Sequence, residues 1–148
     1  RIVLNKGSGM DNRHARRNTH QRNSVLEAAK GLNHPTAREI YLHIAKASPI
    51  SLGTVYRNLQ VLIEEGALAP VIGDPSALRY DHRTLPHHHL YCRGCAQVYD
   101  LPLPYDARLN EAAAAQSGLQ IESHAITFQG LCPACGQPRR PAPRTDER

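Results

Sequence analysis

The sequence predicts a mixed α/β (α+β) fold in two parts, with helices and a β-hairpin first and short strands alternating with helix afterwards. Apolar residues recur at helical spacing in segments 19–30, 36–45 and 52–65. Beyond Gly66, turn residues and alternating apolar residues replace that period, which is typical of strands. These two observations set the fold class, and the order of the elements then defines each part.

Start and stop signals mark the three helices. Gly31 follows the first helix, 19–30, as a stop signal. Thr36 is a candidate N-cap for the second helix, and Glu39 completes a capping box with it. Ser51 is the candidate N-cap of the third helix. Each helix is therefore predicted from its ends as well as from its apolar period.

A short linker containing Pro49 joins the second and third helices, which is a helix-turn-helix arrangement. Segments 67–72 and 78–81 then flank the turn signal at 73–76. A β-hairpin directly after the last helix is a wing. Residues 10–83 therefore predict a winged-helix domain with its wing and a hinge.

The exposed side of the third helix carries residue types that contact phosphates and bases: Thr54, Tyr56, Arg57 and Asn58. The net charge of +5 suits a polyanionic partner, and an aromatic content of 5% disfavours a protein that stacks single-stranded bases. We therefore expect double-stranded DNA as the partner, although an ordinary solvated helix face would look similar.

All four cysteines occur in two Cys-x-x-Cys pairs: Cys92 with Cys95, and Cys132 with Cys135. Two intervening residues let both sulfurs of a pair turn toward one ion, so the four thiolates can bind one tetrahedral Zn²⁺. Such a closed site is structural rather than catalytic, because it has no open coordination position. Disulfides or redox-active dithiols are the alternative interpretation.

A histidine-rich stretch precedes the first cysteine pair. In an extended strand, His87 and His89 share one face and His88 points to the other. Asp81 lies upstream and Asp100 follows the first cysteine pair. Imidazoles mixed with carboxylates suit Fe²⁺, Mn²⁺, Zn²⁺ or Ni²⁺, so these residues predict a second metal site. A solvated loop is the alternative.

Residues 84–136 predict a second domain of strands and one helix. Short strands are expected at 87–91 and 97–100, a helix at 104–116 and one long strand at 119–130. A long strand with an apolar half often pairs with its own copy in a dimer. We therefore interpret this part as an α/β dimerisation domain of a homodimer.

The two ends of the chain are predicted to lie outside both domains. Residues 1–9 contain Gly-Ser-Gly directly before Met10 and look like a vector-derived addition. Residues 137–148, rich in Pro and Arg, are expected to be a disordered tail. The sequence has no long apolar run, so no membrane partner is expected and the default location is the cytoplasm.

Together, these motifs resemble the ferric uptake regulator (Fur) superfamily of bacterial metal-dependent repressors. The resemblance covers roughly residues 17–136. Its strongest pieces are Gln21-Arg22, His34-Pro35-Thr36-Ala37, Ser51-Leu52-Gly53-Thr54-Val55-Tyr56-Arg57-Asn58-Leu59, His87-His88-His89 and the two Cys-x-x-Cys pairs. The family fold is an N-terminal winged helix followed by an α/β dimerisation domain.

The resemblance implies a regulatory metal, Fe²⁺ or Mn²⁺, at the junction of the two domains. Its implied ligands are His34, Asp81, His87, His89 and Asp100. A ligand from the DNA-binding domain lets metal binding fix the angle between the domains, so that a dimer matches a palindromic operator.

The two aspartate ligands resemble the peroxide-sensing (PerR-like) branch, whereas iron-uptake members tend to have Glu. In that branch an oxidant derived from Fe²⁺ and peroxide attacks a ligand histidine, by resemblance His34 or His87, whereas Mn²⁺ represses without reacting.

The chain departs from the family pattern in two places. His20 stands where a proline is common, which leaves the start of the first helix open. Many members have a further metal site around the histidine triplet and the long strand. Pro86 and Ala107 occupy two of its expected positions, leaving His88 and His124, so we expect that site to be absent or weak.

Three other functions compete with a peroxide-sensing repressor. An iron, manganese or zinc uptake repressor of the same fold differs only in the metal that the His/Asp site holds in the cell. A metallohydrolase would need a general base or a motif such as His-Glu-x-x-His, which the sequence lacks. A zinc-ribbon interaction module would have no use for the DNA-contacting residue types of the third helix. We therefore expect a regulator and not an enzyme.

Overall fold

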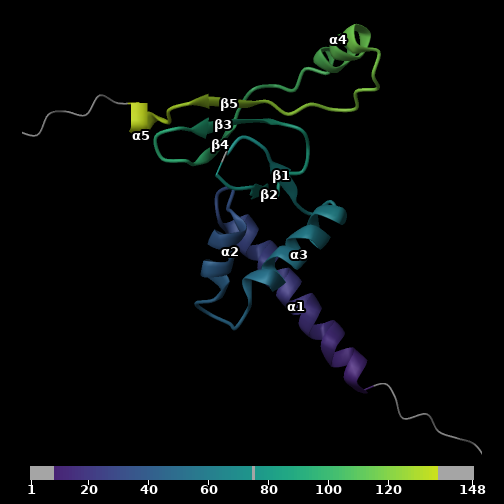
Figure 1. Cartoon of the computed structure of the whole chain (residues 1–148), viewed down its shortest axis with the longest axis vertical. Coiled ribbons are helices and arrows are strands. Elements are labelled where there is room, and N and C mark those ends of the chain that lie inside the picture. The colour runs from purple at the N-terminus through teal and green to yellow at the C-terminus, as the bar shows by residue number, and fades with distance from the viewer. Residues whose placement is uncertain (1–8, 75, 137–148) are drawn as a thin grey trace, which may run out of the picture.

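The structure, a computed structural model, describes residues 9–74 and 76–136, with side chains described from Asn18 onward. Its elements are α1 (Gly9–Gly31), α2 (Ala37–Ile44), α3 (Leu52–Glu64), β1 (Ala69–Val71), β2 (Arg79–Asp81), β3 (His88–Cys92), β4 (Val98–Leu101), α4 (Arg108–Ser117), β5 (Thr127–Gly130) and α5 (Pro133–Gly136). Figure 1 shows two lobes: α1–α3 form the helical lobe, β3–β5 form the sheet lobe, and the β1–β2 hairpin lies between them.

The predicted caps of the second and third helices are confirmed. The Thr36 hydroxyl accepts a hydrogen bond from Glu39 N at 3.2 Å, and Thr36 N donates to Glu39 Oε2 at 2.7 Å, which closes the capping box at α2. At α3 the Ser51 hydroxyl accepts from Thr54 N at 3.1 Å. Both helices therefore begin where their local hydrogen bonds dictate.

α1 begins at Gly9, well before the predicted start at Thr19, whereas its predicted end at Gly31 is confirmed. A proline at position 20 would lack an N–H, but His20 supplies one, so nothing in the residue type stops the helix there. None of the helices in 9–74 and 76–136 combines the length and apolar character needed to span a bilayer. The predictions for 1–8 and 137–148 fall outside the described residues.

The main core lies between α1, α2 and α3. It contains Val25, Ala28, Ala29, Ala37, Ile40, Ile44, Val55, Leu59 and Leu62. Leu68, directly before β1, and Tyr80, within β2, complete this core. Burying a large aliphatic side chain contributes about 1.5–3 kcal/mol, so this core anchors the hairpin to the helices.

The sheet lobe has a much smaller core. β4, β3 and β5 lie in that order, with β3 antiparallel to β4 and parallel to β5. Among the described residues, the buried cluster here consists of Val71, Tyr91 and Val98. Val71 comes from β1, so the hairpin contributes to both cores. With so little apolar burial, the sheet lobe needs another source of stability.

The prediction of one long strand at 119–130 is wrong, because only Thr127–Gly130 is a strand. β3 is five residues long, and its parallel register pairs His89–Cys92 with Thr127–Gly130. The preceding residues therefore have no ladder partner within the described chain, despite their alternating pattern. The helix predicted at 104–116 is α4, Arg108–Ser117, which has no buried residue and stands away from the rest of the molecule (Figure 1).

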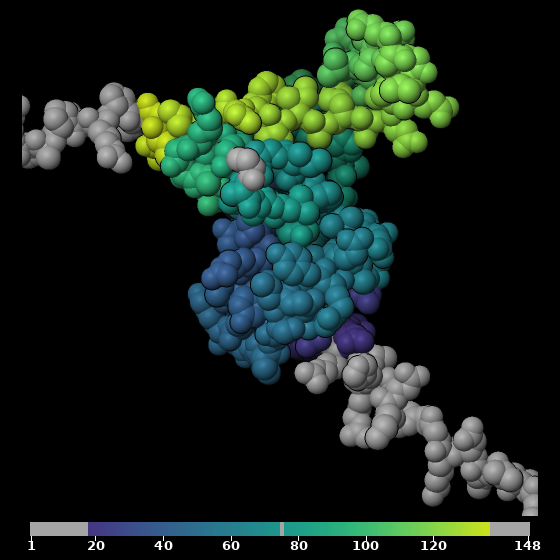
Figure 2. All heavy atoms as spheres, in the orientation of Figure 1, coloured from purple at the N-terminus to yellow at the C-terminus, as the bar shows by residue number. Residues whose placement is uncertain are grey.

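The hairpin is paired as a wing would be, with β1 antiparallel to β2. Its turn rests against β5, because Thr127 Oγ1 donates to Ile72 O at 2.6 Å. Gly73 has a φ of 147°, and a Cβ there would lie 2.4 Å from Thr127 Cγ2, so only glycine fits. In Figure 2 the hairpin region fills the junction between the two lobes.

Candidate functional site

The four cysteines converge at one end of the sheet lobe. Cys92 ends β3, Cys95 follows in the turn, Cys132 precedes α5 and Cys135 lies within it. Their sulfur atoms all lie within 4.8 Å of one another, and all four thiols are free. The 3.9 Å between the sulfurs of Cys95 and Cys132 matches the edge of a tetrahedron with Zn–S bonds of about 2.3 Å, which is about 3.8 Å. This cluster can hold Zn²⁺, and its sulfurs are not joined as disulfides.

Charge within the cysteine cluster also favours a cation. Cys132 N donates to Cys92 Sγ at 3.2 Å and lowers the pKa of the Cys92 thiol. Hydrogen bonding with Cys132 and Cys92 raises the pKa of Cys135 to about 12. A cation bound between the four sulfurs would offset the repulsion between neighbouring thiolates. A Cβ on Gly94 would lie 2.7 Å from Cys135 Cβ, so glycine is required by this close approach.

The second cluster lies where the lobes meet. His34 comes from the loop between α1 and α2, and Asp81 comes from β2. His87 directly precedes β3, His89 lies within β3, and Asp100 comes from β4. One ligand atom from each lies within 4.8 Å of every other. The structure thus brings together all five predicted side chains.

The spacing within this His/Asp cluster fits a single ion. Asp81 Oδ2 lies 3.3, 3.0 and 3.4 Å from the Nε2 atoms of His34, His87 and His89. Asp100 Oδ1 lies 2.9, 3.1 and 3.6 Å from the same three atoms. Two ligands at right angles, each about 2.1 Å from a metal, are about 3.0 Å apart. The nitrogen and oxygen donors suit Fe²⁺, Mn²⁺ or Zn²⁺.

Electrostatics in the His/Asp cluster also prepare it for a cation. Burial raises the pKa of Asp81, but hydrogen bonds with His34 and His89 outweigh it and hold that pKa far below its ordinary value. Burial lowers the pKa of His34, yet its hydrogen bond to Asp81 and the charges of Asp81 and Asp100 raise it overall. His34 Nε2 is buried between the two carboxylates, 3.3 Å from Asp81 Oδ2 and 2.9 Å from Asp100 Oδ1. A proton or a metal ion can satisfy the carboxylates, so the two compete.

Two contacts fix His34 between the lobes. Its backbone has a φ of 43°, a left-handed conformation that is unfavourable for a residue with a Cβ. His34 Nδ1 donates to Asn33 Oδ1 at 3.0 Å, and Asn33 Nδ2 donates to Val98 O of β4 at 2.8 Å. The loop that carries His34 is therefore tied to the sheet lobe independently of any metal.

Arg79 is a buried cation beside the His/Asp cluster whose contacts the sequence did not reveal. Its side chain is 6% exposed, and it pairs with Asp74 Oδ2 at 2.8 Å. Its guanidinium also donates to His34 O at 2.9 Å, to Ala96 O at 2.8 Å and to Glu39 Oε2 at 3.3 Å. One buried cation thus joins the His34 loop, α2, the hairpin turn and the turn after Cys95. An arginine in a short strand gives no sequence signal of such a role.

His88 points away from the His/Asp cluster, as the alternation predicts. Its ring stacks with that of His124 at 5.4 Å between centroids, and the Tyr105 ring stacks on His124 at 4.4 Å. His124 Nδ1 lies 2.7 Å from Asn110 Oδ1. His88 Nδ1 accepts a hydrogen bond from Ile126 N at 3.3 Å, so a ring nitrogen of each histidine contacts a protein group.

A cavity of about 250 Å³ leads to the His/Asp cluster from one side. Asp81, His87 and His89 line it, together with the residues of β1, residues 83–86 and residues 123–125. His34 and Asp100 do not line it. Small molecules thus have a route to one face of the cluster.

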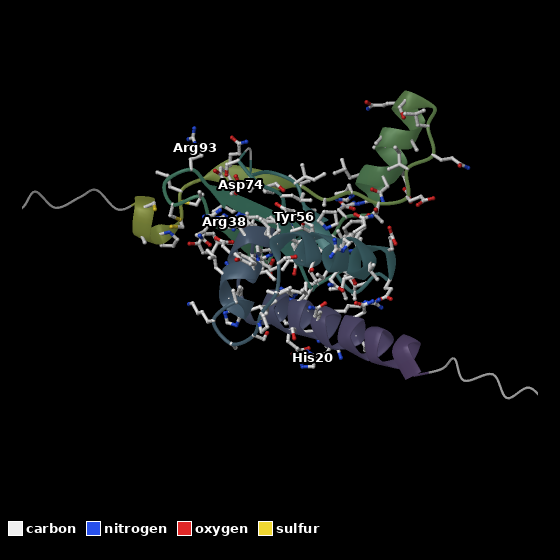
Figure 3. The ribbon with its side chains drawn as sticks, turned by 60° about the horizontal axis from the view of Figure 1, so that its bottom comes forward. His20, Arg38, Tyr56, Asp74 and Arg93 are labelled. Atoms are coloured by element: carbon white, nitrogen blue, oxygen red, sulfur yellow. The ribbon has the colours of Figure 1, made fainter. Side chains whose placement is uncertain are left out.

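The predicted DNA-contacting residues share α3 but differ in how available they are. Tyr56 is 52% exposed and Arg57 is exposed as well. Arg57 Nη2 donates to Thr54 Oγ1 at 3.0 Å, whereas Asn58 Nδ2 donates to Thr54 O at 2.8 Å and is half-buried. Tyr56 belongs to α3 of the helical lobe, whereas Arg93 follows β3 at the edge of the sheet lobe (Figure 3). Tyr56 and Arg57 are therefore the more available pair.

Comparison with known proteins identifies the family. A model described as the ferric uptake regulator family matches residues 13–129. The chain belongs to the ferric uptake regulator family. For this Fur-family protein, the match spans both lobes and includes the whole His/Asp cluster.

The relatives of this Fur-family protein include peroxide regulators. It is 31% identical over 121 residues to the peroxide operon regulator of Bacillus subtilis, covering 80% of this chain and 83% of that one. It is 30% identical over 119 residues to the peroxide-responsive repressor PerR of Staphylococcus aureus, covering 79% and 80%. Its structure is similar to that of the Campylobacter jejuni peroxide stress regulator, with a TM-score of 0.68, 28% identity and coverage of 85% and 96%.

Proposed function

We propose that this protein is a metal-dependent transcriptional repressor that binds palindromic operator DNA as a homodimer and senses peroxide. The observation that carries the proposal is the His/Asp cluster, which draws His34 from the helical lobe and four ligands from the hairpin and sheet. A metal held there fixes one lobe against the other. The matched relatives are named as regulators and repressors, so the chain acts as a regulator and not as an enzyme.

The two lobes correspond to two proposed domains. Residues 10–83 form the winged-helix DNA-binding domain, supported by the capped helices α2 and α3 and by the antiparallel hairpin. Residues 84–136 form the dimerisation domain. Its support is the exposed edge strand β5, on which Phe128 is 43% exposed, together with the adjacent exposed Leu131.

Structural Zn²⁺ is assigned to the cysteine cluster, and Fe²⁺ or Mn²⁺ to the His/Asp cluster. When bound, Fe²⁺ supplies one-electron reduction of peroxide. By the family resemblance, His34 or His87 is the imidazole that is oxidised, and the cavity lined by His87 is the proposed access route for peroxide. Overall, one peroxide places one oxygen on a ring and its second oxygen leaves as water, so the two electrons lost by the imidazole reduce the peroxide.

Peroxide is expected to release DNA from the iron form but not from the manganese form. The test uses operator duplex selected from a random library and protein loaded anaerobically with either metal. After low peroxide, a peptide containing His34 or His87 from the iron form should gain the mass of one oxygen, while the manganese form is the matched control. If both forms keep their operator affinity and no histidine gains oxygen, the protein is instead a metal-uptake repressor.

Arg57→Ala is expected to weaken operator binding by about 1–3 kcal/mol, because the substitution removes a guanidinium that would donate two hydrogen bonds to one base. Binding is measured by gel shift on the operator and on random duplex at one salt concentration. Arg93→Ala removes the same charge from the sheet lobe and should leave affinity nearly unchanged. Equal losses on both duplexes would make Arg57 a phosphate contact.

A further inference from the structure

In each aspartate of the His/Asp cluster, one carboxylate oxygen faces the histidines and the other accepts a hydrogen bond from Arg83. Asp81 Oδ2 faces the three histidines, with His87 Nε2 nearest at 3.0 Å. Its other oxygen, Oδ1, faces away and accepts a hydrogen bond from Arg83 N at 2.8 Å. His82 Nδ1 is also 3.7 Å from this outer oxygen. One oxygen of Asp81 is therefore committed to protein contacts outside the cluster.

Asp100 shows the same division from another strand. Its Oδ1 faces the histidines, with His34 Nε2 nearest at 2.9 Å. Its Oδ2 accepts a hydrogen bond from Arg83 Nη1 at 2.6 Å. A single residue thus holds the outer oxygen of both aspartates, Asp81 through its backbone N–H and Asp100 through its guanidinium.

We infer that Arg83 is a positioning residue that restricts each aspartate to one metal-facing oxygen. The inference rests on the proposed metal site. Carboxylates bind metals through one oxygen or through both, and the choice depends on what else holds the second oxygen. Arg83 competes with the metal for Asp100 Oδ2, so its loss frees that oxygen. The backbone bond to Asp81 does not depend on the side chain.

An ordinary surface ion pair is the competing explanation for the contact. The Arg83 side chain is 61% exposed, and exposed pairs contribute little to stability. That exposure makes the residue suitable for substitution, because its removal leaves no cavity and no buried partner without a contact. A second explanation is that the Arg83 charge merely repels a cation at a distance. Both explanations predict a different Mn²⁺ affinity or number of oxygen ligands from the one that positioning by Arg83 predicts.

The test compares wild type, Arg83→Met, Asp100→Asn and the double variant as full-length, zinc-loaded protein with Mn²⁺ as the probe. Arg83→Met is expected to bind Mn²⁺ about tenfold more tightly, and X-ray absorption should count one more oxygen ligand than in wild type. In the Asp100→Asn background the same substitution should change neither quantity, because position 100 no longer carries a carboxylate for the Arg83 guanidinium to hold. Arg93→Met controls for loss of one exposed arginine.

Each other outcome overturns a defined part of the inference. Equal Mn²⁺ affinity and ligand number in wild type and Arg83→Met would make the contact a surface ion pair. Tighter binding that persists in the Asp100→Asn background, with an unchanged ligand number, would reduce Arg83 to a distant charge. A wild type that binds no Mn²⁺ overturns the proposed site and this inference together, whereas the first two results leave the site standing.

Discussion

Replacing Cys95 by serine is expected to remove the zinc and unfold the sheet lobe. The apolar cluster of that lobe, among the described residues, is Val71, Tyr91 and Val98, which is too small to stabilise it alone. Binding of a structural zinc supplies on the order of 10 kcal/mol in small zinc-dependent modules. Cys95 itself is exposed, so the substitution disturbs no packing and the loss is attributable to the metal.

Zinc content by elemental analysis, thermal unfolding by circular dichroism and mass by light scattering would test this expectation. Cys95→Ser should contain less than one zinc per chain, unfold at a lower temperature and be largely monomeric. Arg93→Ala, two residues away in the same turn, should match wild type in all three. A zinc-free Cys95→Ser protein that remained a stable dimer would contradict the assigned role of the cluster.

Replacing Arg79 by methionine is expected to cost about 3–5 kcal/mol of unfolding free energy, because it leaves the carboxylate of Asp74 buried without its cation. The Asp74 side chain is only 1% exposed. The carbonyls of His34 and Ala96 lose their donor at the same time. Affinity for Mn²⁺ should also fall, although Arg79 touches no ligand side chain, because the His34 loop loses its support.

Urea unfolding would measure the stability change, with Arg38→Met, an exposed arginine of α2, as control. Adding Asp74→Asn to Arg79→Met should restore part of the loss, since no charge then remains buried. If the double variant is no more stable than Arg79→Met, the lost carbonyl contacts rather than the buried charge explain the cost.

The loss of unfolding free energy in Arg79→Met should depend on pH, because it depends on whether the Asp74 carboxyl group is ionised. Burial raises its pKa, but hydrogen bonds from Ser76 and Arg79 together with the Arg79 charge lower it below the ordinary 3.8. In wild type the resulting stabilisation is therefore present above pH 3.8 and lost as the pH falls below it. In Arg79→Met the two hydrogen bonds from Ser76 to Asp74 remain, but the hydrogen bond and charge of Arg79 are lost, so the pKa of Asp74 is higher than in wild type. The difference in unfolding free energy between wild type and Arg79→Met should thus narrow as the pH falls through the range around 3.8, where Asp74 becomes protonated.

Local signals in the sequence were sufficient for much of the fold. Thr36 with Glu39, and Ser51, cap their helices through contacts within three residues, so the residue types alone specify them. The hairpin turn and the two Cys-x-x-Cys pairs are local in the same sense. Alternation in a strand likewise separated His88 from His87 and His89. These features depend on neighbours in the chain, which a sequence displays directly.

Long-range pairing was not predictable in this way. Residues 119–126 alternate as a strand would, but a strand also needs a partner, and the ladder with β3 begins only at Thr127. His34 joined the predicted cluster only through the family resemblance, because nothing local marks a histidine before a helix as a ligand. The roles of Arg79 and Arg83 depend on acceptors brought close by folding, including Asp100 and Ala96.

The parallel pairing of β3 with β5 also affects the order in which the parts of the chain can fold and bind zinc during synthesis. α1, α2, α3 and the hairpin are contiguous, so the helical lobe can fold as soon as these residues leave the ribosome. All five residues of the His/Asp cluster have been made once Asp100 is added. The partner strand of β3 and the second thiol pair come only after α4. A nascent chain halted before β5 thus carries a full set of His/Asp donors but only half of the zinc ligands, and zinc capture is a late step of biogenesis.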